Sequence, residues 1–160
     1  MSSRIAELGP AAALLAAGSA IAFLGGCLSL ELPETFVVEE RGTDELRAVT
    51  ADDGILLARE FSDSLQAKLD FWTEALRADF TGNRGYTLLG DRRVKDADRR
   101  DGVEFLFEAT ARGTPHRYLV MLFVFEGWPR NTIRVVEFAA PRQSFDRHLP
   151  SVRKAILTGR

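Results

Sequence analysis

Residues 118–125 read YLVMLFVF, an eight-residue run without a charged side chain. A strand with one solvated face alternates apolar and polar residues, whereas this run is apolar on both of its faces. Such a strand either lies inside a sheet that is covered on two sides or turns one face to a partner. We expect a core strand and not an interface, so the rest of the chain must supply neighbouring strands and covering helices.

The flanking segments supply the strands. In residues 103–110 and 132–139, successive side chains fall on alternate faces with the period of two that is typical of a strand. Val103, Phe105 and Phe107 share one face of the first segment. Residues 35–40 and 86–94 are two further expected strands. Residues 46–50 and 55–61 form a hairpin around residues 51–54, where Asp53-Gly54 supplies the positive φ that a tight turn needs.

Two expected helices could cover the sheet, on one face or on both. The first carries apolar side chains at steps of three and four, namely Leu65, Leu69, Trp72, Leu76 and Phe80. Asp63 and Gln66 fit a capping box at its start, and Gly82 fits its end. The second spans residues 142–157 with a stripe of Phe145, Leu149, Val152 and Ile156. Pro150 lies inside it, so we expect a kink or a break near His148.

These elements predict an α+β fold, an antiparallel sheet flanked by two main helices, in one domain of residues 35–160. The order resembles the PsbP/Mog1-like fold across about residues 35–158. The likeness lies in Gly85-Tyr86 after the long helix, the Asp101-Gly102 turn, the Tyr118 strand and the closing helix. Members of that superfamily mostly serve as binding or assembly factors, and the resemblance transfers no catalytic residue.

The amino-terminal region has a different character. Residues 11–30 read AAALLAAGSAIAFLGGCLSL, without charge, after a short polar lead in which Arg4 is the only basic side chain. This layout is typical of a bacterial signal peptide, here residues 1–26. Residues 11–30 are also long enough to stay as an uncleaved membrane anchor. Plain cleavage that releases a soluble protein is the third and least favoured interpretation.

The run ends in Leu24-Gly25-Gly26-Cys27, which contains the only cysteine of the chain. This tetrapeptide resembles the lipobox of bacterial lipoproteins. The resemblance implies that Cys27 becomes the first mature residue and carries diacylglycerol and an N-acyl chain such as palmitate, followed by a short linker to residue 34. Two or more acyl chains hold a protein stably on a membrane.

Both leading interpretations place the domain on the same side of the membrane. Arg4 precedes the apolar run and acidic residues follow it, which favours an inner amino terminus. The domain is therefore expected in the bacterial cell envelope, anchored to a membrane and facing the periplasm or the exterior. With a net charge of −2 and interspersed basic and acidic residues, the chain lacks the basic patch of a nucleic-acid binder.

Residue types for catalysis are scarce. The two histidines, His116 in an expected turn and His148 in the last helix, have no spacing typical of a catalytic triad. The single cysteine and these histidines are too few for a zinc site. Residues 96–102 (DADRRDG) fit a polar hairpin turn better than a calcium loop. We therefore predict no catalytic residue, no metal site and no cofactor besides the lipid on Cys27.

Two further features concern surfaces. Glu104 and Glu108 share a strand face, and we expect it to be solvated, with Arg134 as a partner for the carboxylates. Trp128, beside Pro129 in a loop, is a possible partner contact, although a ring folded over the core is the slightly favoured alternative.

The sequence therefore predicts a membrane-tethered, non-enzymatic binding or assembly factor that contacts an envelope protein or a small ligand. The alternatives are a signal-anchored subunit of an envelope complex, and an envelope hydrolase or isomerase that uses unidentified carboxylates.

Overall fold

The computed structural model describes Leu28 and residues 30–159. Seven strands form one antiparallel sheet in the order β1-β2-β3-β7-β6-β5-β4. The elements, in chain order, are β1 (Val37–Arg41), β2 (Glu45–Val49), β3 (Ile55–Asp63), α1 (Leu69–Ala78), a π-type turn η2 (Asp79–Asn83), β4 (Thr87–Lys95), β5 (Asp101–Ala111), β6 (Thr114–Phe125), β7 (Asn131–Pro141) and α2 (Arg142–Thr158).

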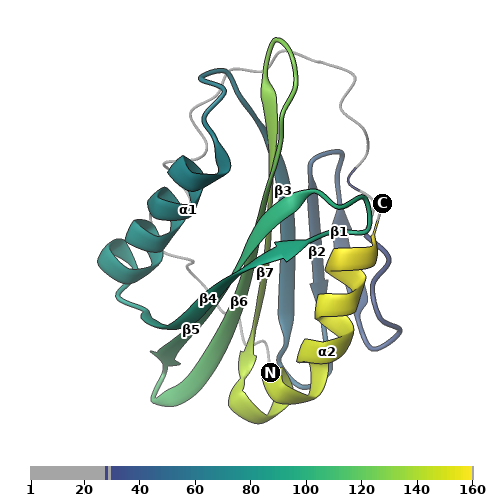
Figure 1. The fold of residues 1–160 in the computed structure, drawn as a ribbon. Coiled ribbons are helices and arrows are strands. Elements are labelled where there is room, and N and C mark those ends of the chain that lie inside the picture. The colour runs from purple at the N-terminus through teal and green to yellow at the C-terminus, as the bar shows by residue number, and fades with distance from the viewer. Residues whose placement is uncertain (1–27, 29, 160) are drawn as a thin grey trace.

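The two helices lie on opposite sides of the sheet (Figure 1). Strand β6 pairs with β5 on one side and with β7 on the other, and its residues 119–123 are all buried. The α+β class is confirmed, and so is the expectation that the apolar run of β6 is covered on both faces. One end of the molecule is marked by the loop between β6 and β7, which projects beyond the neighbouring strands in Figure 1.

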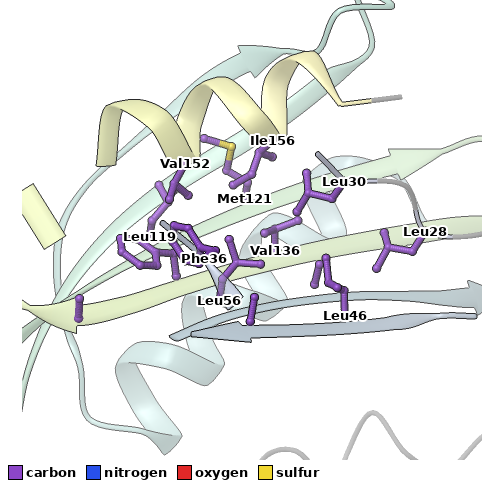
Figure 2. Close-up of a cluster of buried hydrophobic side chains, with 14 of the residues drawn as sticks. Leu28, Leu30, Phe36, Leu46, Leu56, Leu119, Met121, Val136, Val152 and Ile156 are labelled. Atoms are coloured by element: carbon purple, nitrogen blue, oxygen red, sulfur yellow. The ribbon is translucent and has the colours of Figure 1, made fainter. Parts of the chain in front are cut away.

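The larger core lies between α2 and the sheet (Figure 2). Phe145, Val152 and Ile156 of α2 contribute to it, and Phe138 stacks on Phe145 with ring centroids 5.3 Å apart. Leu28 and Leu30 are also buried in this core, at 3% and 6% exposure. The segment expected to be a linker thus supplies core side chains before β1 begins.

The second core lies between α1 and the opposite sheet face. It is built largely from aromatic rings, with Phe80 stacked on Phe107 at a centroid distance of 4.8 Å. Leu76 of α1 and Trp72 pack in the same cluster. The predicted apolar stripe is therefore confirmed from Leu69 to Phe80.

The predicted start of this helix is wrong. α1 begins at Leu69 with Lys68 at its N-cap position, and Lys68 makes no side-chain capping hydrogen bond. Leu65 lies in the preceding loop and is 83% exposed. The Asp63 carboxylate instead accepts hydrogen bonds from the backbone N–H groups of Leu65 and Ala67, at 2.9 and 2.8 Å. These bonds hold a non-helical loop, because an Asp side chain competes with the helix for backbone donors.

The structure also tests two local predictions. A kink or a break was expected near His148, and the break is wrong because α2 runs unbroken through Pro150. In the β2–β3 turn, the positive φ predicted for Asp53-Gly54 is confirmed, and it belongs to Asp53, at 65°, and not to Gly54. Gly54 is required for space, since a Cβ there would lie 2.5 Å from the Thr50 hydroxyl oxygen.

Both edge strands are irregular. The pairing of β1 with β2 shifts register between Val38 and Glu40, and the pairing of β4 with β5 shifts between Leu88 and Gly90. All five residues of β1 are exposed, and most of β4 is exposed. β-Bulges of this kind interrupt the row of unpaired backbone groups at a sheet edge.

The prediction of a solvated Glu104 is wrong. Its side chain is 2% exposed beneath α2, where Arg153 Nη2 lies 2.6 Å from Oε1. Arg92 of β4 approaches the same oxygen at 3.2 Å. The expected partner Arg134 pairs with Glu60 instead, at 2.6 Å. Because a buried carboxylate needs compensating charge, the two arginines make Glu104 a buried ionic link between the sheet and α2.

We predict that Glu104→Ala lowers the free energy of unfolding by about 3 kcal/mol, the lower end of the range for removing one partner of a buried ion pair. The lower end applies because both arginines reach solvent and stay hydrated. Urea denaturation measures the change. Glu39→Ala is the matched control, since Glu39 pairs with Arg47 at 48% exposure and should cost less than about 1 kcal/mol. Equal effects of the two variants would contradict the assignment.

Candidate ligand-binding site

A pocket forms where α1 leaves its sheet face uncovered. α1 has 10 residues and is about 15 Å long, whereas β6 has 12 residues and extends about 40 Å. The helix packs over the part of the face built by Val120, Leu122 and Ile133. The part near the β5–β6 turn, at the end of the sheet opposite the β6–β7 loop, remains open.

The pocket in this open part has a volume of about 280 Å³. Its floor is the sheet, with Leu57 of β3, Tyr118 of β6, and Glu137 and Ala139 of β7. These side chains share one face because Leu57 pairs with Glu137 and Tyr118 pairs with Ala139. Polar groups stand around the apolar floor, namely Arg47, Asp53, Arg112, Thr114 and His116.

Glu137 is the ionisable group of the floor. Its side chain is 16% exposed, and Oε2 lies 3.4 Å from Arg84 Nη1. Burial raises the pKa of Glu137 above its ordinary value, although the guanidinium groups of Arg84 and Arg59 act in the opposite direction. A group with a perturbed pKa in a concave apolar site is a candidate for ligand contact.

Tyr118 of the floor packs against a second tyrosine, Tyr86. The rings of Tyr86 and Tyr118 lie 4.6 Å apart between centroids. Burial raises the pKa of the Tyr118 hydroxyl, and a hydrogen bond with Tyr86 raises it further. Tyr118 therefore stays a neutral phenol that can donate or accept one hydrogen bond at the edge of the floor.

Arginines lie near Tyr118 and on the rim of the pocket. Arg84 Nε pairs with Asp79 at 3.0 Å, and the Arg84 guanidinium lies 4.0 Å from the Phe80 ring centre. Arg47 on the rim pairs with Glu39 at 2.9 Å. An apolar floor beside guanidinium, phenol and carboxyl groups suits a small amphipathic molecule with a polar or anionic head.

Of the candidate site residues singled out from the sequence and described by the structure, His116 lines the pocket and the others do not. Trp128 is 88% exposed in the β6–β7 loop, away from the pocket. Cys27 lies outside the described residues. His116, predicted in a solvated turn, belongs to β6 and lines the pocket, with Nδ1 2.9 Å from the Thr114 carbonyl oxygen.

His148 has a structural role. Its Nε2 lies 2.9 Å from Asp52 Oδ1, which links α2 to the β2–β3 turn. The Thr50 hydroxyl donates to the same carboxylate at 2.6 Å, and this bond and His148 lower the pKa of Asp52. His148 is 6% exposed and packs against the rings of Phe36 and Phe138. A buried imidazole in this position has no room for a substrate.

The 96–102 turn is held by its own charges. Arg100 pairs with Asp96 at 2.7 Å and with Asp98 at 2.6 Å. These pairs neutralise the carboxylates that a calcium ion would need. In Leu28 and residues 30–159, no three His, Cys, Asp or Glu side chains gather closely enough to hold a metal ion.

Sequence reasoning missed Glu137, although a signal was present. Ile133, Val135 and Ala139 share its strand face, so a carboxylate interrupts an otherwise apolar row. A charge in such a row must be paired or must serve a site. The contact that identifies it, with Arg84, joins residues 53 positions apart and could not be predicted from local spacing.

The fold and the pocket together define an α+β protein whose antiparallel sheet has a helix on each face. Part of the face under α1 is left open. No family model matches the chain, and no curated protein matches it. Among solved structures it is similar to LpqN of Mycobacterium tuberculosis, which is involved in cell envelope biogenesis. The TM-score is 0.67 at 7% identity, over 79% of this chain and 78% of that chain.

A second similar structure is a Pseudomonas aeruginosa protein of unknown function, a putative regulator. Its TM-score is 0.47 at 11% identity, over 80% of this chain and 82% of that chain. The likeness to LpqN shows a shared fold. None of the helices in the described part of the chain is both long enough and apolar enough to cross a membrane.

We predict that Ala139→Phe fills the pocket and weakens binding of the fluorescent probe 1-anilinonaphthalene-8-sulfonate, which has an apolar body and an anionic head. Titration on a chain that starts at Leu28, and so contains both cores, measures an expected loss of about tenfold, equal to about 1.4 kcal/mol. Val37→Phe is the control, because Val37 is 66% exposed on edge strand β1. Unchanged probe binding in Ala139→Phe would rule the pocket out as the binding site.

Proposed function

We propose that this protein is a membrane-tethered, extracytoplasmic binding or assembly factor of the bacterial cell envelope. The observation that carries the binding role is the pocket over Tyr118, Glu137 and Ala139, with an apolar floor and a polar rim. The proposed ligand is a small amphipathic molecule, which suits a domain that works beside lipid.

The tether rests on Leu24-Gly25-Gly26-Cys27. In the proposed organisation, residues 1–26 are a signal peptide, Cys27 carries the acyl chains, and residues 27–34 lead into the domain of residues 35–160. The backbone N–H of Leu28 donates to the Thr43 carbonyl at 3.2 Å, and the Leu28 side chain is buried. A lipid on Cys27 would therefore hold the domain close to the membrane surface.

The envelope location has further support from the likeness to LpqN, whose involvement in envelope biogenesis is a property of that protein. The PsbP/Mog1-like assignment is part of the proposal. It is supported by a sheet covered by helices on both faces and by the order of the elements.

A second candidate function is an envelope enzyme with carboxylate chemistry, and the raised pKa of Glu137 favours it. Glu137→Gln keeps the shape and removes the ionisation. For a binding factor, we predict that this variant changes the pH dependence of probe binding and leaves no reaction to lose. Conversion of a candidate envelope ester or glycoside by the wild type, abolished in Glu137→Gln, would establish the enzyme instead.

We predict that Cys27→Ser abolishes acyl modification and releases or mislocalises the protein. Mass spectrometry of the mature amino terminus and membrane fractionation of intact cells measure the two effects. An uncleaved anchor of residues 11–30 would leave the variant in the membrane with Met1 present, which identifies the signal-anchored alternative. Acyl-free wild-type protein in the membrane fraction would count against the lipoprotein.

A further inference from the structure

Two of the most exposed large apolar side chains in the described part of the chain belong to neighbouring loops. Trp128 of the β6–β7 loop is 88% exposed, and Leu65 of the β3–α1 loop is 83% exposed. Gln66 Nε2 donates a hydrogen bond to the Gly127 carbonyl at 3.0 Å. Gln66 follows Leu65 and Gly127 precedes Trp128, so this hydrogen bond joins the two loops.

Buried polar groups hold these loops in place. Asn131 is 3% exposed, accepts a hydrogen bond from the Gly127 N–H at 3.1 Å and donates to the Ala67 carbonyl at 3.2 Å. Asp63 is 6% exposed and also accepts from the indole N–H of Trp72, at 3.2 Å. Satisfied buried polar groups fix one conformation. The two exposed apolar side chains are therefore presented by a braced structure.

The chain enters the domain toward the same end of the sheet. Leu28 is bonded to Thr43 in the β1–β2 turn, and the next residue in that turn, Asp44, accepts from Glu60 N–H at 2.8 Å. Glu60 is opposite Arg134 in the β3–β7 register. Asn131 precedes Arg134 by three residues in β7, so it lies about 10 Å nearer to the β6–β7 loop, at 3.3 Å per residue.

The charges around the loops are paired. Lys68 pairs with Glu126 at 2.9 Å, and Arg93 of β4 pairs with Asp70. A surface without a large excess of either sign favours an apolar contact over an electrostatic one. Tryptophan is also enriched at the membrane–water interface, where an amphipathic ring is stable.

From this placement we propose that Trp128 and Leu65 contact the lipid bilayer to which the chain is tethered. The two side chains would form a second, non-covalent attachment besides the lipid anchor. The inference rests on the proposed membrane tether. A flat surface can touch both the entry at Leu28 and the more distant Trp128 only if the strands are tilted to it. The domain therefore lies obliquely, with the β1–β2 turn and the β6–β7 loop toward the bilayer, and the pocket at the far end of the sheet faces away.

The test uses the full-length protein, purified from membranes and reconstituted into phosphatidylcholine vesicles with or without brominated acyl chains. Bromine quenches only indole rings that reach the acyl region. We expect brominated lipid to quench wild-type emission strongly and Trp128→Phe emission weakly, because Trp72 is then the only indole. Retention of native circular dichroism in Trp128→Phe shows that the fold is intact.

Two further variants in the Trp128→Phe background locate the contact. Leu65→Trp is expected to restore the quenching. Val37→Trp is the matched control, since Val37 is exposed and opposite Val49 at the other end of the sheet, and it should restore none.

The outcomes separate the two proposals. Wild-type protein that floats with the vesicles while its Trp128 emission is quenched only by aqueous iodide overturns the bilayer contact and leaves the tether standing. Equal quenching of Val37→Trp and Leu65→Trp also overturns it, because the predicted orientation would be absent. Protein that does not float with the vesicles overturns both the tether and the contact.

Discussion

The burial of β6 on both faces is the constraint on which the rest of the structure depends. Leu119, Met121 and Phe123 point to the α2 side, and Val120 and Leu122 point to the α1 side. Removing the side chains of both faces from water contributes a large favourable part of the free energy of folding. It can be realised only if a layer forms on each face, so the chain needs a helix from its middle and another from its end.

The two covering helices differ in length, and the candidate site follows from this difference. α2 has 17 residues and is linked to the sheet by Glu104, whereas α1 has only 10. The shorter helix leaves part of its sheet face open, and that part carries Glu137 beside Tyr118. A longer α1 would bury these groups under a complete core. The candidate site is thus the uncovered remainder of a hydrophobic face.

The periodic patterns of the sequence were sufficient to predict the α+β class, the strand segments and the stripe from Leu69 to Phe80, because these depend on neighbours a few residues away. Predictions failed where a distant partner decides the structure. Glu104 is buried because Arg153 arrives from 49 residues away. The predicted start of α1 failed for a local reason, because the Asp63 carboxylate binds the backbone N–H groups of Leu65 and Ala67 instead of capping a helix. Glu137 also has a distant partner, Arg84, so the pocket could not be located from the sequence.

The two bulged edges of the sheet would gain importance under the proposed membrane tether. Confinement to a plane raises the local concentration of identical copies, and their outer strands meet repeatedly in similar orientations. A straight edge would then add strand after strand and produce fibrils. The register shifts at Val38 and Gly90, with the charges of Arg92 and Arg93 along β4, oppose such growth and would keep tethered copies separate.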